Sequence, residues 1–417
     1  MIKRILSSEL AKGSILLFIM FNFYNFLNFV FHFSMGRMLG PENYGILAVL
    51  MSLIYIYAIP TEAIQNIISK YTSELNINKE YGKLNFLVSK SSIRALQISV
   101  FVFLFSIILA IFISKVLEIN FWLIALTNSF LLLAFIIPIV KGVLQGRKKF
   151  FLLGTGMIIE AVLKLAFAIL FVFIGFEVFG AMIGLLIGSS IGFAFCFYCN
   201  KDILDKQREK IHFGGAYKNG LPYFVVIFTI YIILSLDIIM AKLFFTPEIV
   251  GKYAVLSMLG KIIFFGTLAI SKTMFPLTSE KKDSPKDSII LFKKSFLIVL
   301  ILCLLATFAY FLIPELIIKT LYGSGYVDMS KYLVYSGISL SFLSLSNLIL
   351  IYGLSTNKIR NYYYIIVFLF IEITLLVLFH STILEYILAI ITSNIVIFIC
   401  SFLFLRNNEH KYNNPGI

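Results

Sequence analysis

Long apolar runs alternate with short charged or turn-rich breaks along the whole chain. Cutting the sequence at these breaks predicts about twelve helices of roughly twenty apolar residues each. Their approximate ranges are 11–35, 44–66, 92–114, 119–140, 153–175, 178–200, 220–245, 252–276, 295–315, 330–354, 361–379 and 383–405. A helix of this length crosses the hydrocarbon core of a bilayer, so the pattern predicts an all-α integral membrane protein.

One stretch of the chain occurs twice. Residues 41–50 read Pro-Glu-Asn-Tyr-Gly-Ile-Leu-Ala-Val-Leu, and residues 247–256 read Pro-Glu-Ile-Val-Gly-Lys-Tyr-Ala-Val-Leu. Each copy lies between two apolar runs, which predicts the same tight turn between two membrane helices. An internal repeat in a membrane protein indicates two related halves with the substrate path between them. We therefore expect two pseudo-symmetric six-helix bundles around a central cavity, residues 1–210 and residues 211–417.

The composition agrees with a membrane protein, and the position of the charges indicates its orientation. Hydrophobic residues make up 60% of the chain and charged residues 13%, with a net charge of +14. Most Lys and Arg fall in alternate loops; the fourth predicted span, for example, is followed by Lys141, Arg147, Lys148 and Lys149. By the positive-inside rule both termini are cytoplasmic, and the protein is a multi-pass protein of the cell (inner) membrane. The basic excess is thus a topology signal, and we expect no nucleic-acid partner.

Enzyme chemistry finds no support in the sequence. The longest outer loop, 314–329, is too short for a catalytic domain, and no phosphate-binding loop, zinc-protease motif or nucleophile triad is present. Cys196 and Cys199 form a lone CxxC pair, which we interpret as small buried thiols rather than a metal site. We expect neither a metal nor a cofactor, apart from a coupling H⁺ or Na⁺.

Small residues mark one helix face in the first half. Gly180, Gly184, Gly188 and Gly192 follow each other at intervals of four. This spacing predicts a face that allows close packing of a neighbouring helix.

Ionisable residues inside apolar spans are costly and are therefore candidates for function. Lys164 lies near the middle of the fifth span, with Glu160 one turn earlier on the same face. They form either a self-neutralised pair between helices or a cavity site in which Lys164 binds an anionic substrate and Glu160 tunes it. Lys261, in the eighth span, has no acidic residue three or four positions away. It either reaches an acid on another helix or contributes a second cation to the cavity, and we favour the cavity.

Further polar residues complete the set of candidates. Asn22, Asn25, Asn28 and His32 share one face of the first span and offer donors and acceptors suited to sugars. Asp237, in the seventh span, falls beside the repeat equivalent of His32. These two form either a proton- or cation-sensitive latch or ordinary hydroxyl contacts. Glu62 near the end of the second span is a further gating candidate, and Glu372 in the eleventh span is a partner for Lys261 or Lys164.

Several segments resemble the polysaccharide-export flippases of the multidrug/oligosaccharidyl-lipid/polysaccharide (MOP) superfamily. Residues 36–45, Gly-Arg-Met-Leu-Gly-Pro-Glu-Asn-Tyr-Gly, resemble the signature that closes the first helix of that family. The resemblance extends in the family's order to residues 64–75, 144–147, Asp237 with 250–253, and 321–326.

The resemblance implies a fold of the MATE/MOP type and a flippase function. The expected cargo is a polyprenyl-(di)phosphate-linked oligosaccharide of the O-antigen kind, moved from the cytoplasmic to the outer leaflet by alternating access of a monomer. Members of this branch often place Lys or Arg in the cavity for the diphosphate, a role that Lys164 and Lys261 fit. Polysaccharide polymerase or ligase machinery is an expected partner. The alternative is a cation-coupled multidrug or organic-cation exporter of the same superfamily, which would have a cavity of net negative charge.

Overall fold

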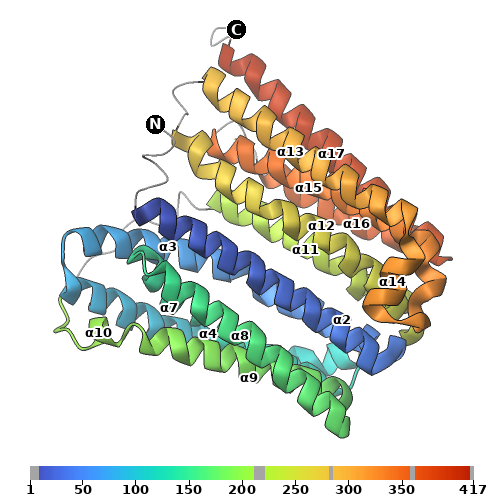
Figure 1. Cartoon of the computed structure of the whole chain (residues 1–417), viewed down its shortest axis with the longest axis horizontal. Helices are drawn as coiled ribbons and strands as arrows, with labels where there is room; N and C mark the ends of the chain where they lie inside the picture. Colours follow the sequence, from blue (N-terminus) through green and yellow to red (C-terminus); the bar gives the residue numbers. More distant parts are fainter. Residues whose placement is uncertain (1–8, 211–220, 281–284, 357–361, 414–417) are drawn as a thin grey trace. The chain divides into compact units, whose positions relative to one another are not determined.

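The structure is a computed structural model that describes residues 9–210, 221–280, 285–356 and 362–413. Within these residues the chain is helical, with turns but no β-strand. The chain divides into two compact units, the N-terminal lobe (Met1–Lys218) and the C-terminal lobe (Asn219–Ile417), which are described separately (Figure 1). The boundary expected after residue 210 stays a prediction, because residues 211–220 lie outside the described part.

The N-terminal lobe is built on a layer of long helices in which α8 packs against both α9 and α2 (Figure 1). Its helices are α2 (Glu9–Tyr57), α3 (Ile59–Ile77), α4 (Tyr81–Leu117), α5 (Phe121–Asn128), α6 (Phe130–Ala134), α7 (Ile137–Gly146), α8 (Phe150–Phe171), α9 (Glu177–Tyr198) and α10 (Lys201–Leu204). A π-helical turn, Val172–Phe176, links α8 to α9. The chain reverses at Gly175 (φ 101°) and Glu177 (φ 47°), and the glycine takes this left-handed region without a steric penalty.

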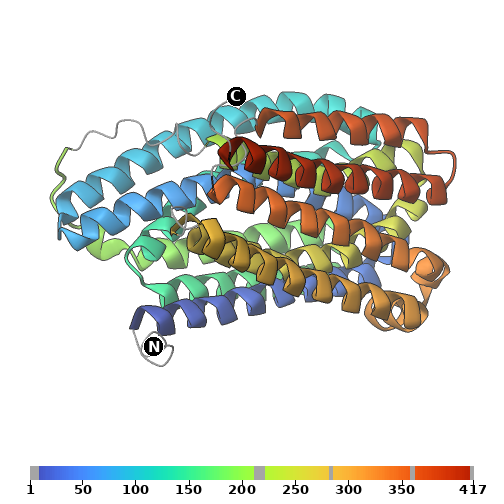
Figure 2. The ribbon, with the colours of Figure 1, turned by 90° about the horizontal axis from the view of Figure 1, so that it is seen from above.

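The C-terminal lobe is arranged around α15, which packs against α12, α13 and α17. Its helices are α11 (Leu221–Phe244), α12 (Pro247–Glu280), α13 (Pro285–Leu312), α14 (Pro314–Tyr322), α15 (Leu333–Ser355), α16 (Val367–Leu378) and α17 (Ile383–Asn413), with 3₁₀ segments Ser324–Tyr332 and Tyr362–Ile366. Its long helices run side by side, as Figure 2 shows from above. Because α15 is surrounded, its hydroxyls bond within the protein; Ser336, for example, donates to the carbonyl of Leu256 at 2.6 Å.

The repeated stretch forms the predicted turn in both lobes. Gly40 leaves the helical region (φ 71°, ψ 175°) and divides α2 into two helices, the second beginning at Pro41. In the other lobe Pro247 begins α12. Proline suits this position because a first helical residue needs no intrahelical N–H donor. The second helix of each pair therefore begins at the Pro-Glu itself, a few residues before the expected start.

Twelve membrane crossings can be drawn through the described residues. Nine stretches are long and apolar enough to cross a bilayer. Two of them, Leu16–Ile77 and Phe150–Tyr198, contain the breaks at Gly40 and Gly175 and so make two crossings each. The shorter apolar helix Tyr363–Leu378 supplies the last crossing. Each lobe thus contains six, and the expected all-α membrane fold is confirmed.

Exposure within the structure shows which helices face lipid. Only 17% of the apolar window in α4 and 22% of that in α13 is buried, against 72% for the stretch that contains α15. Their exposed residues are large and apolar, such as Phe101 and Phe112 on α4 and Leu305 and Phe308 on α13. Such surfaces are stable only against hydrocarbon, so α4 and α13 form part of the lipid-facing wall of their lobes.

Candidate functional site

The N-terminal lobe contains a buried charged cluster on α8. The carboxylate of Glu160 forms an ion pair with Lys141 of α7, with Nζ and Oε2 2.8 Å apart. The hydroxyl of Tyr24 on α2 also donates to Glu160 at 3.4 Å. Among the described residues Glu160 therefore pairs with Lys141 and not with Lys164, so the first of the two alternatives, a self-neutralised pair one turn apart, is not formed. Lys141, on α7, reaches this carboxylate from another helix.

Lys164, one turn further along α8, is also buried, with 6% of its surface exposed. Its ammonium donates a hydrogen bond to the amide oxygen of Asn28 on α2. The same group lies 5.4 Å from the centre of the Phe31 ring and 6.0 Å from that of Tyr24. The amide and the electron-rich ring faces partly replace water around this charge. They do not neutralise it.

The glycine face of α9 packs against the part of α8 that carries these charged residues. A methyl group added at Gly188 would stand 2.5 Å from the backbone N of Lys164, and one added at Gly192 would stand 2.7 Å from Cβ of Glu160. Gly184 meets Ala168 of α8 just as closely, at 2.3 Å. The predicted packing role of the glycine face is confirmed, and the partner helix is the one that carries the cluster.

The other candidates of the first helix have different surroundings. The Asn22 amide donates to the carbonyl of Phe18 on the exposed side, and Asn25 is half-buried. His32 is buried, and its two ring nitrogens lie 3.4 Å from the hydroxyl of Tyr44 and 3.5 Å from that of Tyr55. The predicted polar face thus runs from an exposed amide to a buried imidazole. Glu62 lies half-buried in the first turn of α3, and its gating role stays a prediction.

The C-terminal lobe contains a second cluster, centred on Asp237 of α11. Lys261 Nζ lies 3.3 Å from Oδ1 of Asp237, so Lys261 has the acid partner on another helix that we considered as the alternative. The other carboxylate oxygen accepts hydrogen bonds from Ser257 and, at 3.1 Å, from Tyr253. The Tyr386 hydroxyl of α17 donates to the backbone carbonyl of Asp237 at 2.5 Å. These partners come from α12 and α17, so the pattern within one helix does not reveal them.

Glu372 of α16 differs from every other acid of the two clusters. It is 1% exposed, and neither carboxylate oxygen has a hydrogen-bond partner among the described residues. The expected direct pairing with Lys261 or Lys164 is therefore not observed. Its charge still interacts with those of Lys261 and Asp237, so the three residues form one electrostatic group. An ionised carboxylate without a partner is unfavourable here unless it binds a proton or a cation.

Related positions of the two lobes make related contacts. Tyr55 and Lys261 are separated by as many residues as Pro41 and Pro247. Tyr55 contacts His32 and Lys261 contacts Asp237, each on the preceding helix of its own lobe. The internal repeat thus extends from the turn to the buried polar centre.

These features define an all-α, multi-pass membrane protein of two six-crossing lobes, each with a buried charged cluster. Solved structures of this class share its fold. An inward-facing multidrug resistance MATE family transporter of the MOP superfamily gives a TM-score of 0.78 at 13% identity, over 94% of this chain and 96% of that one. The lipid II flippase MurJ, in an inward closed conformation, gives 0.69 at 16% identity over 94% and 86%. A MOP superfamily transporter from Pyrococcus furiosus gives 0.66 at 14% identity over 99% and 98%.

A sequence profile gives the family. The profile described as "Polysaccharide biosynthesis protein" matches residues 10–282, and the chain belongs to this family. Together with the fold, the match makes the chain a member of the MOP superfamily of transporters and flippases. A search of curated proteins gave no match.

Proposed function

We propose that the chain moves a polyprenyl-(di)phosphate-linked oligosaccharide from the cytoplasmic to the outer leaflet of the cell membrane, for the synthesis of a cell-surface polysaccharide. The family description and the fold shared with a lipid II flippase support this cargo. Alternating access of the two lobes carries the oligosaccharide across while the lipid tail stays in the bilayer.

The charge of the N-terminal cluster is the observation that carries the proposal. Two ammonium groups, Lys141 and Lys164, stand against one carboxylate, Glu160, and only Lys141 forms an ion pair with it. A surplus cation in an apolar lobe is expensive unless it serves an anionic ligand. A phosphate or diphosphate group matches Lys164 in sign, and the neighbouring Asn28 amide suits both phosphate and sugar hydroxyls.

The C-terminal cluster has the opposite balance and is assigned to coupling. Two carboxylates, Asp237 and Glu372, accompany one ammonium, Lys261. A proton or Na⁺ bound at Glu372 would make this group neutral, which links the charge of the lobe to the ion gradient. Lys261 thereby belongs to the coupling group, and its predicted contact with the substrate phosphate stays an expectation.

The same negative balance favours the alternative, a cation-coupled exporter of organic cations, since a MATE family transporter shares the fold. The two functions separate in proteoliposomes that contain the purified chain. One preparation holds a fluorescent undecaprenyl diphosphate-linked oligosaccharide, whose outer-leaflet fraction is read by chemical quenching. The other measures uptake of a fluorescent organic cation driven by a proton or sodium gradient.

We expect flipping of the lipid-linked oligosaccharide and a loss of at least about tenfold in rate for Lys164→Ala. Lys164→Arg should keep part of the rate because it keeps the charge, and Lys148→Ala should behave as wild type because Lys148 is exposed. In a strain that lacks its own flippase, Lys164→Ala should fail to restore outer-leaflet oligosaccharide. Transport of the organic cation without flipping would replace the proposal by the alternative.

A further inference from the structure

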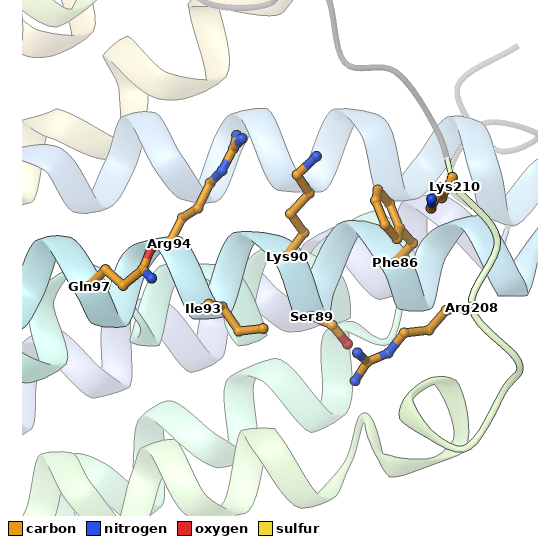
Figure 3. A pocket seen from close by; sticks show the side chains of 8 residues that line it. All are labelled: Phe86, Ser89, Lys90, Ile93, Arg94, Gln97, Arg208 and Lys210. Carbon is orange, nitrogen blue, oxygen red and sulfur yellow. The ribbon is translucent and has the colours of Figure 1, made fainter.

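A basic pocket of about 510 Å³ lies beside the first half of α4 and shares no lining residue with either charged cluster (Figure 3). Four of its lining residues are cations, Lys90, Arg94, Arg208 and Lys210, and none of the described residues that line it is acidic. Figure 3 shows Lys90 and Arg94 extending from α4, while Arg208 reaches back from the segment after α10 toward Ser89. Lys90 and Arg94 extend to one side of α4 (Figure 3), whereas Arg208 lies on the side of Ser89, so the pocket is lined by two segments of the N-terminal lobe that are far apart in the sequence.

The second wall of the pocket is held in place by specific hydrogen bonds. The Asn85 side-chain amide, 1% exposed, donates to the backbone carbonyls of Leu204 at 3.0 Å and Lys206 at 2.5 Å. The backbone N–H of Glu209 donates to the carbonyl of Gly82 at 3.1 Å. Because these hydrogen bonds fix the segment to the start of α4, they also hold Arg208 beside α4. The hydrogen bonds thus fix the backbone of the second wall, while the four cationic side chains are exposed.

Within the part of the chain that the structure describes, none of the four cations forms an ion pair, although nearby Lys83 pairs with Glu80 at 2.7 Å. Lys90 lies 5.1 Å from the centre of the Phe86 ring, a contact that orients the ammonium but leaves its charge in place. Four positive charges that line one pocket and have no ion-pair partner among the described residues favour an anionic ligand.

The position of the pocket along α4 identifies where that anion comes from. Residues 95–114 contain no charged side chain and are flanked by Arg94 on one side and Lys115 on the other. As a helix this stretch is about 30 Å long, which equals the thickness of the hydrocarbon core. Arg94 therefore marks the level where the lipid headgroups begin. The pocket lies at that level, and the exposed apolar surface of α4 continues from it through Leu96 and Phe101.

We propose that this pocket binds the phosphate group of an anionic phospholipid of the surrounding bilayer, with its acyl chains along the exposed face of α4. Phosphate at headgroup level matches the cations, and the apolar face beyond Ile93, itself 54% exposed, matches the chains. A free phosphate ion would use the charges but not this face. The pocket uses none of the residues of the two charged clusters, so its occupancy can be measured without transport.

The test measures lipid retention by the purified full chain. Protein is released from nanodiscs of equal phosphatidylglycerol and phosphatidylcholine content, and native mass spectrometry counts the lipids that stay bound. The site variant combines Lys90→Gln, Arg94→Gln, Arg208→Gln and Lys210→Gln. The control combines Lys70→Gln, Lys148→Gln, Lys293→Gln and Lys294→Gln, which removes the same charge from exposed positions elsewhere. A third variant, Asn85→Ala, releases the second wall but keeps every cation.

We expect wild type and control to retain phosphatidylglycerol preferentially, and the site variant to lose at least about tenfold of that preference. Asn85→Ala should lose several-fold of the same preference, because it releases the wall that carries Arg208. Lipid retention by diffuse surface charge would not depend on that wall. Equal retention by the site variant, or an equal loss in the control, would overturn the proposal. So would displacement of the lipid by millimolar inorganic phosphate, or a preference for undecaprenyl phosphate over phosphatidylglycerol, since either would name a different ligand.

Discussion

The ammonium of Lys261 lies 3.3 Å from the carboxylate of Asp237, across two helices and 24 residues of sequence. Both groups are buried, and the remaining oxygen of Asp237 is occupied by Tyr253 and Ser257. Such a pair holds its two helices in a fixed register only while both partners are present. Replacing each partner alone and then both together therefore distinguishes an ion pair from a set of separate contacts.

Lys261→Met should destabilise the protein by about 3–5 kcal/mol, because it leaves the buried carboxylate of Asp237 without its cation. The double variant Lys261→Met/Asp237→Asn should recover most of that loss, since both charges are then gone. Chemical denaturation of the purified protein in detergent gives the three free energies and the coupling between the sites. Lys252→Met on the same helix is the control; its ion pairs involve exposed acids, so the cost should stay below about 1 kcal/mol. A double variant as unstable as the single one would show that the two charges do not act as a pair.

Glu372→Gln should raise the melting temperature, in contrast to most substitutions of buried residues. The wild-type carboxylate is 1% exposed and has no hydrogen-bond partner among the described residues, so its ionised form carries the desolvation cost of a charge, whereas glutamine carries only the smaller cost of a neutral amide. A gain of about 1 kcal/mol corresponds to roughly 2–4 °C for a domain of this size. Glu160→Gln is the matched control and should lower the melting temperature, because Glu160 is paired with Lys141.

The same variant tests the coupling role of Glu372. If the carboxylate carries the coupling proton or cation, Glu372→Gln should flip lipid-linked oligosaccharide at a rate that no longer responds to an imposed gradient. A lower melting temperature together with unchanged gradient dependence would contradict both the unpartnered state and the coupling role.

The parts of the site that depend on one helix could be predicted from the sequence. Gly184 and Gly188 follow a helical period, so their packing face was visible, and the repeat of Pro41 and Pro247 located the two turns. Hydropathy alone gave the number of crossings, because the bilayer imposes the length of each.

The parts that depend on several helices could not be predicted. The sequence pattern groups Lys141 with the basic loop residues 147–149. In the structure α7 continues to Gly146, so Lys141 lies on a helix and pairs with Glu160. Likewise, the spacing of Glu160 and Lys164 on one helix allows either a pair or a cavity site, and does not reveal Lys141 as the partner of Glu160. The partner of Lys261 required knowledge of which face of α11 meets α12, and that is set by packing over the whole lobe.

The ion pair between Arg147 and Asp202 predicts a response to acid outside the membrane-spanning segments. Two hydrogen bonds from Arg147, at 2.8 and 2.5 Å, hold the pKa of the Asp202 carboxyl below its ordinary value of 3.8. The pair therefore stabilises α10 above that value, and the contribution is lost as the pH falls below it. Since the Asp202 side chain is 51% exposed, the effect should not exceed about 1 kcal/mol.

Hydrogen-exchange protection of residues 201–206, corrected for the intrinsic rate at each pH, measures this contribution. Protection should fall between pH 5 and pH 3 in wild type. Asp202→Asn should have the low protection at both values, and Asp205→Asn, at an exposed neighbouring position, should follow wild type. A fall of the same size in Asp202→Asn would assign the acid response to another group.

Gly188→Ala should disrupt the N-terminal cluster without changing any charge. The added methyl would stand 2.5 Å from the backbone N of Lys164 and 2.7 Å from the carbonyl O of Glu160, so α8 and α9 must separate. Overpacking against backbone costs about 1–3 kcal/mol and would move both charged side chains.

Gly266→Ala on α12 is the matched control, because its methyl meets nothing within 4 Å and gains up to about 1 kcal/mol of helix propensity. Melting temperatures should therefore rank Gly188→Ala below wild type and Gly266→Ala at or above it, and the flipping rate should fall in Gly188→Ala alone. A Gly188→Ala protein with wild-type stability and rate would mean that the close contact of α8 and α9 does not position Glu160 and Lys164.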